Sequence, residues 1–181
     1  MSPPTIHRRI VLVAGAPGSG KSTLARPLAA ALSMPLLSKD MIKEAITDAL
    51  GPGDGSIGAS RPAGAAAMEV LWTLAAHAPC AVLEANFRPG CAYERDRMAA
   101  LGAGIVEVHC ECGAEEAARR FAARARRGAQ HAAHPMTELP AALLAEYASP
   151  MDVGPLIRVD TRQPVDIAAL APRVAATFTK G

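Results

Sequence analysis

Short runs of apolar residues alternate with longer stretches of mixed polarity along the 181-residue chain. The apolar runs are rich in Val, Ile and Leu, a pattern typical of strands that are buried on both faces of a sheet. Five of these runs are predicted to be strands, at residues 9–15, 34–38, 80–86, 104–112 and 155–161.

The stretches between the runs have helical character. In residues 63–78, for example, Met68, Leu71, Trp72 and Ala75 recur on one helical face. Helices are predicted at residues 21–32, 40–50, 63–78, 93–101, 114–127 and 165–178, with a further one near Tyr147. Strands that alternate with helices predict an α/β fold, in which a mainly parallel five-stranded sheet is covered on both faces as a three-layer α/β/α sandwich.

The chain also contains a predicted loop, and its length bears on the number of domains. Residues 51–62 are rich in glycine and proline, and we expect a loop there. The length of the chain favours a single domain over residues 1–181.

The most specific motif directly follows the first predicted strand. "GAPGSGKS" (residues 15–22) fits the pattern G-x-x-x-x-G-K-[ST] and lies between a strand and a helix. Glycines let the backbone wrap closely around phosphate oxygens, and the amide N–H groups and the helix start favour an anion. Lys21 is expected to reach the β- and γ-phosphates, and Ser22 to ligate Mg²⁺. The nucleotide-binding residues are predicted to be Gly15, Ala16, Pro17, Gly18, Ser19, Gly20, Lys21, Ser22 and Thr23.

Charged residues also follow the second strand, and ligands of parallel sheets bind at the carboxyl ends of strands. Asp40 is predicted to orient or deprotonate an acceptor hydroxyl; the alternative is that it only caps the following helix. Lys43 lies one helical turn later, so it would share that face and contact an anionic or polar acceptor. Lys39 is expected to face solvent.

The third strand ends in "LEANFRPG" (residues 83–90). Glu84 follows four apolar residues and is a candidate to orient Mg²⁺ through water. Asn86 and Arg88 are candidates to contact substrate or phosphate, although a plain salt bridge explains Arg88 equally well.

An arginine-rich helix follows the fourth strand. Arg120, Arg124 and Arg127 are spaced to share one helical face, and Gly128 would allow a hinge. Arginines on a closing lid can stabilise the negative charge of a phosphoryl group in transfer. Two alternatives remain open, a basic surface for nucleic-acid phosphates and a solvated helix face. His131 and His134 are expected to be exposed loop residues.

Composition and charge add limits. A formal net charge of +2 does not by itself indicate a nucleic-acid partner. The four cysteines form no C-x-x-C pair, so we expect reduced thiols in a cytoplasmic protein. In "HCEC" (residues 109–112) a strand would place His109 and Cys110 on opposite faces, which argues against a metal site. The start of the chain is polar, so we expect neither a secretion signal nor a membrane partner.

Together, "GAPGSGKSTLA", "LLSKDMIKEAI", "VLEANF" and "RRFAARARRG" resemble the small P-loop kinases that are grouped with AAA-type ATPases. Members of this group are similar to chloramphenicol phosphotransferase, zeta-toxin kinases, gluconate kinase and the kinase domain of polynucleotide kinase. The resemblance implies a P-loop NTPase fold with a helical lid at about residues 115–140, and ATP and Mg²⁺ as cofactors. It also places the acceptor-binding carboxylate at Asp40 and lid arginines at Arg124 and Arg127, while Glu84 departs from the usual Asp.

The resulting hypothesis is a kinase that transfers the γ-phosphate of ATP to a hydroxyl of a small-molecule acceptor. Its expected catalytic residues are Lys21, Asp40, Arg124 and Arg127. A polynucleotide 5′-hydroxyl kinase is an alternative, but few aromatic residues are present for stacking bases. A non-kinase ATP-binding switch or regulatory ATPase is the other. The sequence does not indicate the acceptor or the oligomeric state.

Overall fold

The central sheet consists of five parallel strands. The computed structural model describes residues 8–127 and 130–179, and the N-terminal stretch used above to argue against a signal lies outside them. The strands are β1 (Arg9–Ala14), β2 (Leu36–Ser38), β3 (Cys80–Glu84), β4 (Gly104–Glu111) and β5 (Leu156–Asp160). They lie in the order β2-β3-β1-β4-β5, with every neighbouring pair parallel. The predicted α/β class and five-stranded sheet are therefore confirmed.

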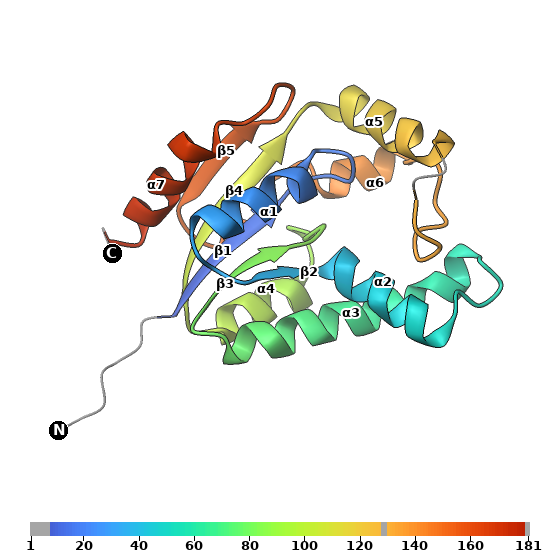
Figure 1. Ribbon diagram of the computed structural model, residues 1–181, viewed down its shortest axis with the longest axis horizontal. Helices are drawn as coiled ribbons and strands as arrows, with labels where there is room; N and C mark the ends of the chain where they lie inside the picture. Colours follow the sequence, from blue (N-terminus) through green and yellow to red (C-terminus); the bar gives the residue numbers. More distant parts are fainter. Residues whose placement is uncertain (1–7, 128–129, 180–181) are drawn as a thin grey trace.

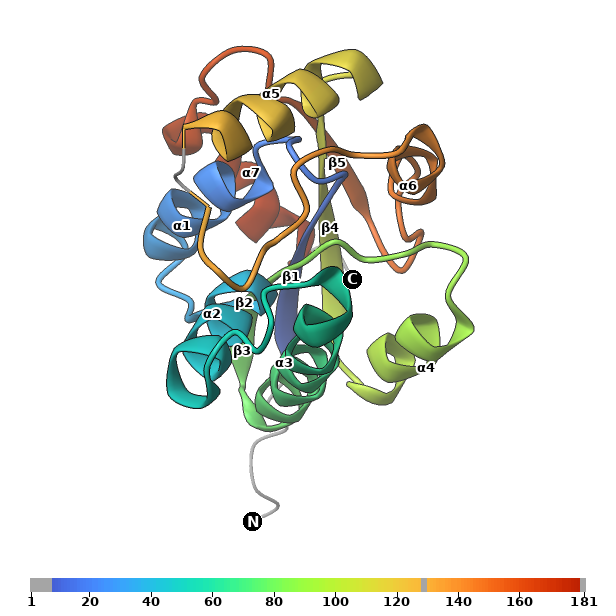
Figure 2. The same cartoon turned by 90° about the vertical axis from the view of Figure 1, so that its right-hand side faces the viewer.

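Two helical layers cover this sheet (Figures 1 and 2). Helices α1 (Lys21–Ala31) and α7 (Ile167–Thr177) cover one face, where Val11 and Val13 of β1 join their core. Helices α3 (Ile57–His77) and α4 (Ala92–Ala100) cover the other, where Ile10 and Leu12 point. Because successive strand residues alternate between faces, a strand packed on both sides is apolar throughout.

Three further helices lie near the carboxyl ends of the strands (Figure 1). They are α2 (Lys39–Leu50), α5 (Ala114–Arg126) and α6 (Ala141–Glu146). Figure 1 shows the segment after α5 descending toward α2 and the start of α3. We name residues 130–139 of this segment the crossing segment.

The predicted loop at residues 51–62 is wrong in its second half, since α3 begins at Ile57. Ser56 caps this helix, because its Oγ accepts a hydrogen bond from the amide of Ala59 at 3.0 Å. The side chain of Ser60 also bonds to residues outside α3, namely Lys43 and Ala133. Capping by Ser56 and the contacts of Ser60 with distant segments therefore stabilise a helix here, despite the local glycine and proline content.

No helix within the described parts of the chain combines the length and apolar character needed to cross a bilayer.

Candidate active site

The loop between β1 and α1 contains three glycines with positive φ angles, at Gly15, Gly18 and Gly20. Gly15 has a φ of 139°, and a Cβ there would lie 2.6 Å from the carbonyl oxygen of Cys110. Gly18 has a φ of 82°, and a Cβ there would overlap the carbonyl oxygen of Ala117 in α5. The Ser19 amide closes the turn by donating to the carbonyl of Ala16 at 3.0 Å. The loop thus wraps tightly against β4 and α5 and leads directly into α1, as an anion cradle does.

A threonine from the far end of the chain supports this loop. Thr161 follows β5, and its Oγ1 donates to the carbonyl of Ser19, at 2.5 Å, and lies 3.1 Å from the carbonyl oxygen of Glu111. Arg120 in turn donates to the carbonyl of Thr161 at 3.1 Å and to Glu116 at 2.6 Å. Sequence reasoning did not single out Thr161, whose signal was a hydroxyl residue at the end of the predicted fifth strand.

Lys21 is the first residue of α1 and is 5% exposed. Among the described residues its Nζ makes one long hydrogen bond, 3.3 Å to the carbonyl oxygen of Ala16. Burial lowers the pKa of Lys21, while the nearby carboxylates of Glu84 and Asp40 act in the opposite direction. The ammonium therefore keeps free donors in a position beside the loop, where an anionic ligand would stabilise its charge.

Glu84 links two hydroxyls at the strand ends. Its carboxylate is 1% exposed and accepts hydrogen bonds from Ser22 at 2.9 Å and from Ser38 at 2.5 Å. The sheet register explains this contact, because Ser38 and Glu84 are paired across β2 and β3. A hydroxyl and a carboxylate are hard oxygen ligands of the kind that Mg²⁺ prefers, so Ser22 and Glu84 fit this ion.

A cavity of about 820 Å³ runs from the loop to α2, α3 and the crossing segment. It brings together most residues that the sequence analysis selected: Pro17, Gly18, Gly20, Lys21, Ser22, Thr23, Asp40, Lys43, Glu84, Asn86 and Arg124. The selected residues outside its lining are Gly15, Ala16, Ser19, Arg88 and Arg127. Gly15, Ala16 and Ser19 belong to the loop but do not line the cavity. Arg88 and Arg127 lie outside both the loop and the cavity lining.

Asp40 lies in the first turn of α2 and faces the cavity. The cap of α2 is Ser38, so capping does not explain Asp40. Burial alone would raise the pKa of Asp40, but Lys39, His134 and Lys21 together bring it below its usual value. Lys39 pairs with Asp40 at 3.2 Å and lines the cavity, so our expectation that Lys39 faces solvent is wrong. Asp40 is therefore an ionised carboxylate at neutral pH.

Two further candidates end up in different surroundings. Asn86 lines the cavity, and its side-chain Oδ1 is buried without a hydrogen-bond partner in the described structure. Arg88 instead forms an ion pair with Glu94 at 2.8 Å, which corresponds to the salt-bridge alternative stated for it.

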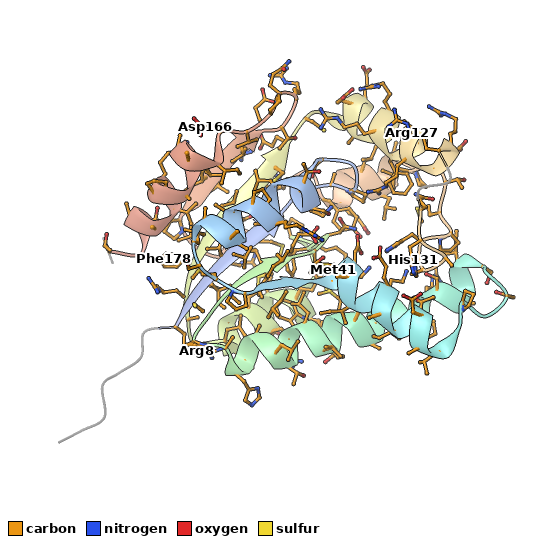
Figure 3. All side chains as sticks on the ribbon, viewed as in Figure 1. Arg8, Met41, Arg127, His131, Asp166 and Phe178 are labelled. Carbon is orange, nitrogen blue, oxygen red and sulfur yellow. The ribbon has the colours of Figure 1, made fainter. Side chains whose placement is uncertain are left out.

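The three arginines of the predicted lid face do not all lie at the cavity. Arg120 and Arg124 line the cavity, and the guanidinium carbon of Arg124 lies 5.4 Å from the centre of the Phe121 ring. Arg127 is exposed at the end of α5 (Figure 3). The proposed hinge at Gly128 lies outside the described residues.

The crossing segment is fastened to the helices below it. His131 pairs with Asp48 at 2.9 Å and His134 with Glu44 at 3.0 Å, both on α2. Figure 3 shows His131 where the segment meets the end of α2. Both histidines line the cavity and are partly buried, so the expectation of exposed loop histidines is wrong. The crossing segment forms one wall of the cavity.

The "HCEC" stretch lies in and just after β4. Cys110 packs in the core with α1 and α7, whereas Glu107 and His109 are buried in strand positions of opposite parity. Burial raises the pKa of the Cys110 thiol to about 12, so this thiol stays protonated at neutral pH. As predicted for a strand, Cys110 and His109 lie on opposite faces of the sheet.

Comparisons with known proteins agree with this geometry. A family model described as an AAA domain matches residues 10–149. A candidate kinase from Chloroflexus aurantiacus is 31% identical, with a TM-score of 0.83 and coverage of 94% of this chain and 98% of that one. A comparison with curated proteins gave no match.

More distant structures share the fold. APS kinase from Mycobacterium tuberculosis, solved with AMPPNP and APS, is 22% identical, with a TM-score of 0.60 and coverage of 98% of this chain and 99% of that one. Shikimate kinase from Acinetobacter baumannii, solved with shikimate, is 19% identical, with a TM-score of 0.59 and coverage of 96% and 94%. The fold of this chain is thus a kinase-like P-loop fold, which implies nucleotide binding.

Proposed function

The chain belongs to the AAA domain family, and from this premise we propose that it is a kinase that transfers the γ-phosphate of ATP to a hydroxyl of a small-molecule acceptor. One observation carries the proposal. The phosphate-binding loop and the Asp40 carboxylate line the same cavity. A donor held at the loop and an acceptor held at Asp40 would therefore meet inside it.

The residues at the loop suit ATP and Mg²⁺. Lys21 and the loop amides would hold the β- and γ-phosphates, and Ser22 and Glu84 would hold the metal. Bound there, ATP with Mg²⁺ supplies the phosphoryl group and neutralises part of its charge. The bond between Ser22 and Glu84, 2.9 Å long, keeps both oxygen groups close together for this purpose.

Asp40 suits the positioning of an acceptor more than strong proton abstraction. Its lowered pKa makes it a weak base, yet the ionised carboxylate is a good hydrogen-bond acceptor for a hydroxyl. Phosphoryl transfer through a loose transition state depends chiefly on position and electrostatics. Holding the hydroxyl in line is therefore the contribution that this carboxylate would make.

We take α5 and the crossing segment as the lid, at about residues 115–140. Arg124 projects into the cavity from α5 and would stabilise negative charge on the transferring group. The crossing segment would exclude water, because it covers the cavity from α5 to α2.

The direct test is ADP release measured against a panel of metabolites and antibiotics that carry hydroxyls. The blank is Lys21→Ala, which removes the phosphate-binding ammonium. A compound that raises ADP release in the wild type alone, with a matching phosphorylated product in mass spectrometry, supports the proposal. If calorimetry with Mg²⁺ finds that the folded protein binds neither ATP nor GTP, the proposal is wrong.

Asp40→Asn separates a kinase from a nucleotide-dependent switch. In a kinase, this change leaves ATP affinity unchanged and lowers transfer about a hundredfold, as expected when the group that holds the acceptor hydroxyl in line is lost. In a switch, hydrolysis and partner binding continue unaltered.

The polynucleotide alternative is tested separately, by transfer of labelled phosphate from ATP to an oligonucleotide with a free 5′-hydroxyl.

A further inference from the structure

Lys43 is a buried lysine without a carboxylate partner among the described residues. It is 7% exposed and lines the cavity. Its Nζ donates to the hydroxyl oxygen of Ser60 at 2.5 Å. The hydroxyl of Ser60 in turn donates a hydrogen bond to the carbonyl oxygen of Ala133, at 2.8 Å. An ammonium has three donors, so Lys43 keeps two for a ligand.

The acidic groups around Lys43 are already engaged. Asp40 pairs with Lys39 at 3.2 Å, and Glu44 accepts a hydrogen bond from His134 at 3.0 Å. The exposed Asp48, farther along α2, pairs with His131. Lys43 therefore forms no ion pair within the described chain, and the nearby carboxylate of Asp40 is shared with Lys39. Burying an unpaired charge is costly, and an anionic ligand would remove that cost.

The side chain of Lys43 is held in place against α3. A Cβ added at Gly64 would lie 3.6 Å from Cε and 4.0 Å from Nζ of Lys43. These are ordinary van der Waals distances, so the lysine stem runs directly along α3 beside Gly64. Burial lowers the pKa of Lys43 and the charge of Lys39 does the same, while Asp40 opposes them. An anion bound at this position would favour the charged form.

The ammonium of Lys43 lies close to Asp40, the residue that we propose holds the acceptor hydroxyl. Asp40 and Lys43 are three residues apart, so their Cβ atoms lie roughly 5–6 Å from each other on one helical face. The same cavity of about 820 Å³ must also admit a nucleotide, which leaves room for a small acceptor only.

We propose that the acceptor is a small hydroxylated compound with a carboxylate or phosphate group, and that Lys43 binds this anionic group while Asp40 binds the hydroxyl. The inference rests on the proposed kinase function, since it assigns the acceptor to the cavity. It adds the chemical class of the acceptor and the residue that selects it.

The test uses acceptors in matched charged and neutral pairs. The carboxylate pairs are glycerate with glycerol and gluconate with glucitol, and the phosphate pairs are glycerol 3-phosphate with glycerol and glucose 6-phosphate with glucose. Binding is measured by calorimetry in the presence of Mg²⁺ and ADP, and turnover by ADP release. We expect at least one charged member to bind and react, with kcat/KM at least a hundredfold above that of its neutral partner. The responding pair distinguishes carboxylate from phosphate.

Variants tie this preference to Lys43. Lys43→Met should raise the KM of the charged acceptor about thirtyfold or more, change kcat less than threefold and remove most of the preference for the charged member. Lys43→Arg should restore part of it. The control is Arg126→Met, which removes an exposed cation outside the cavity lining and should change nothing.

Failure of the inference and failure of the kinase proposal give different results. Equal use of charged and neutral members, equal losses for both in Lys43→Met, or no binding of any charged probe overturns the inference. Binding of a charged probe that depends on Lys43, without any turnover, supports the anion site and counts against the kinase proposal alone.

Discussion

The hydrogen bond between Ser38 and Glu84 should contribute measurably to stability, and Ser38→Ala tests this. Ser38 is 5% exposed and donates to a carboxylate that is 1% exposed, at 2.5 Å. Removal of a hydrogen bond to a charged group costs about 1.5–3 kcal/mol. Ser38 also caps α2, but its distance to the amide of Met41 is 3.5 Å, so loss of this cap should add well under ~1 kcal/mol. The expected total is about 2–3 kcal/mol.

Ser56→Ala is the matched control. Ser56 caps α3 through an exposed bond of 3.0 Å to the amide of Ala59 and touches no buried carboxylate. Its loss should cost about 1 kcal/mol, the usual value for a cap. Both variants are measured by urea unfolding, followed by circular dichroism at 25 °C. For Ser38→Ala we expect a midpoint lower by roughly 1 M, since urea slopes are typically ~1–3 kcal/mol per M.

A double-mutant cycle assigns the loss to the pair. In a Glu84→Gln background, Ser38→Ala should cost clearly less than in the wild type, because the charged acceptor is already gone. The reasoning is refuted if Ser38→Ala costs no more than Ser56→Ala, or if the cycle shows no coupling between Ser38 and Glu84.

Three further predictions concern the loop, the lid and pH. Gly18→Ala should weaken nucleotide binding at least tenfold in calorimetry, because its Cβ overlaps the backbone of α5, whereas Gly90→Ala meets nothing within 4 Å at a residue without a positive φ and should leave binding intact. Arg124→Gln should lower kcat about tenfold or more and Arg127→Gln should not, since only Arg124 lines the cavity; equal effects in the kinetic assay would contradict this. Burial lowers the pKa of His134 below 6.5 despite the opposing charge of Asp40, so the unfolded chain binds more protons near that pH. Stability should therefore be highest above pH 6.5 and fall as the pH drops below it, and urea unfolding of His134→Gln should show a weaker loss.

The sequence by itself determined the parts of this protein that depend on local pattern. Apolar runs long enough for strands, separated by helical stretches, gave the parallel α/β sheet. The motif at residues 15–22 predicted the P-loop between β1 and α1, because a backbone that wraps closely around phosphate oxygens needs glycine at several positions. Asp40 and Glu84 followed from their places at strand ends, where parallel strands bring residues to one edge. Lys43 followed from its position one helical turn after Asp40.

Only the tertiary structure decided which groups meet there. Ser38 and Glu84 are 46 residues apart, and Thr161 supports Ser19 across 142 residues. Such contacts depend on strand order and register, which periodicity along a chain does not encode. The same holds for helix ends: Arg127 has the spacing to share a face with Arg124, but α5 ends at Arg126, and Arg127 does not line the cavity. Local pattern thus fixes elements and candidate residues, whereas long-range packing selects the contacts between them.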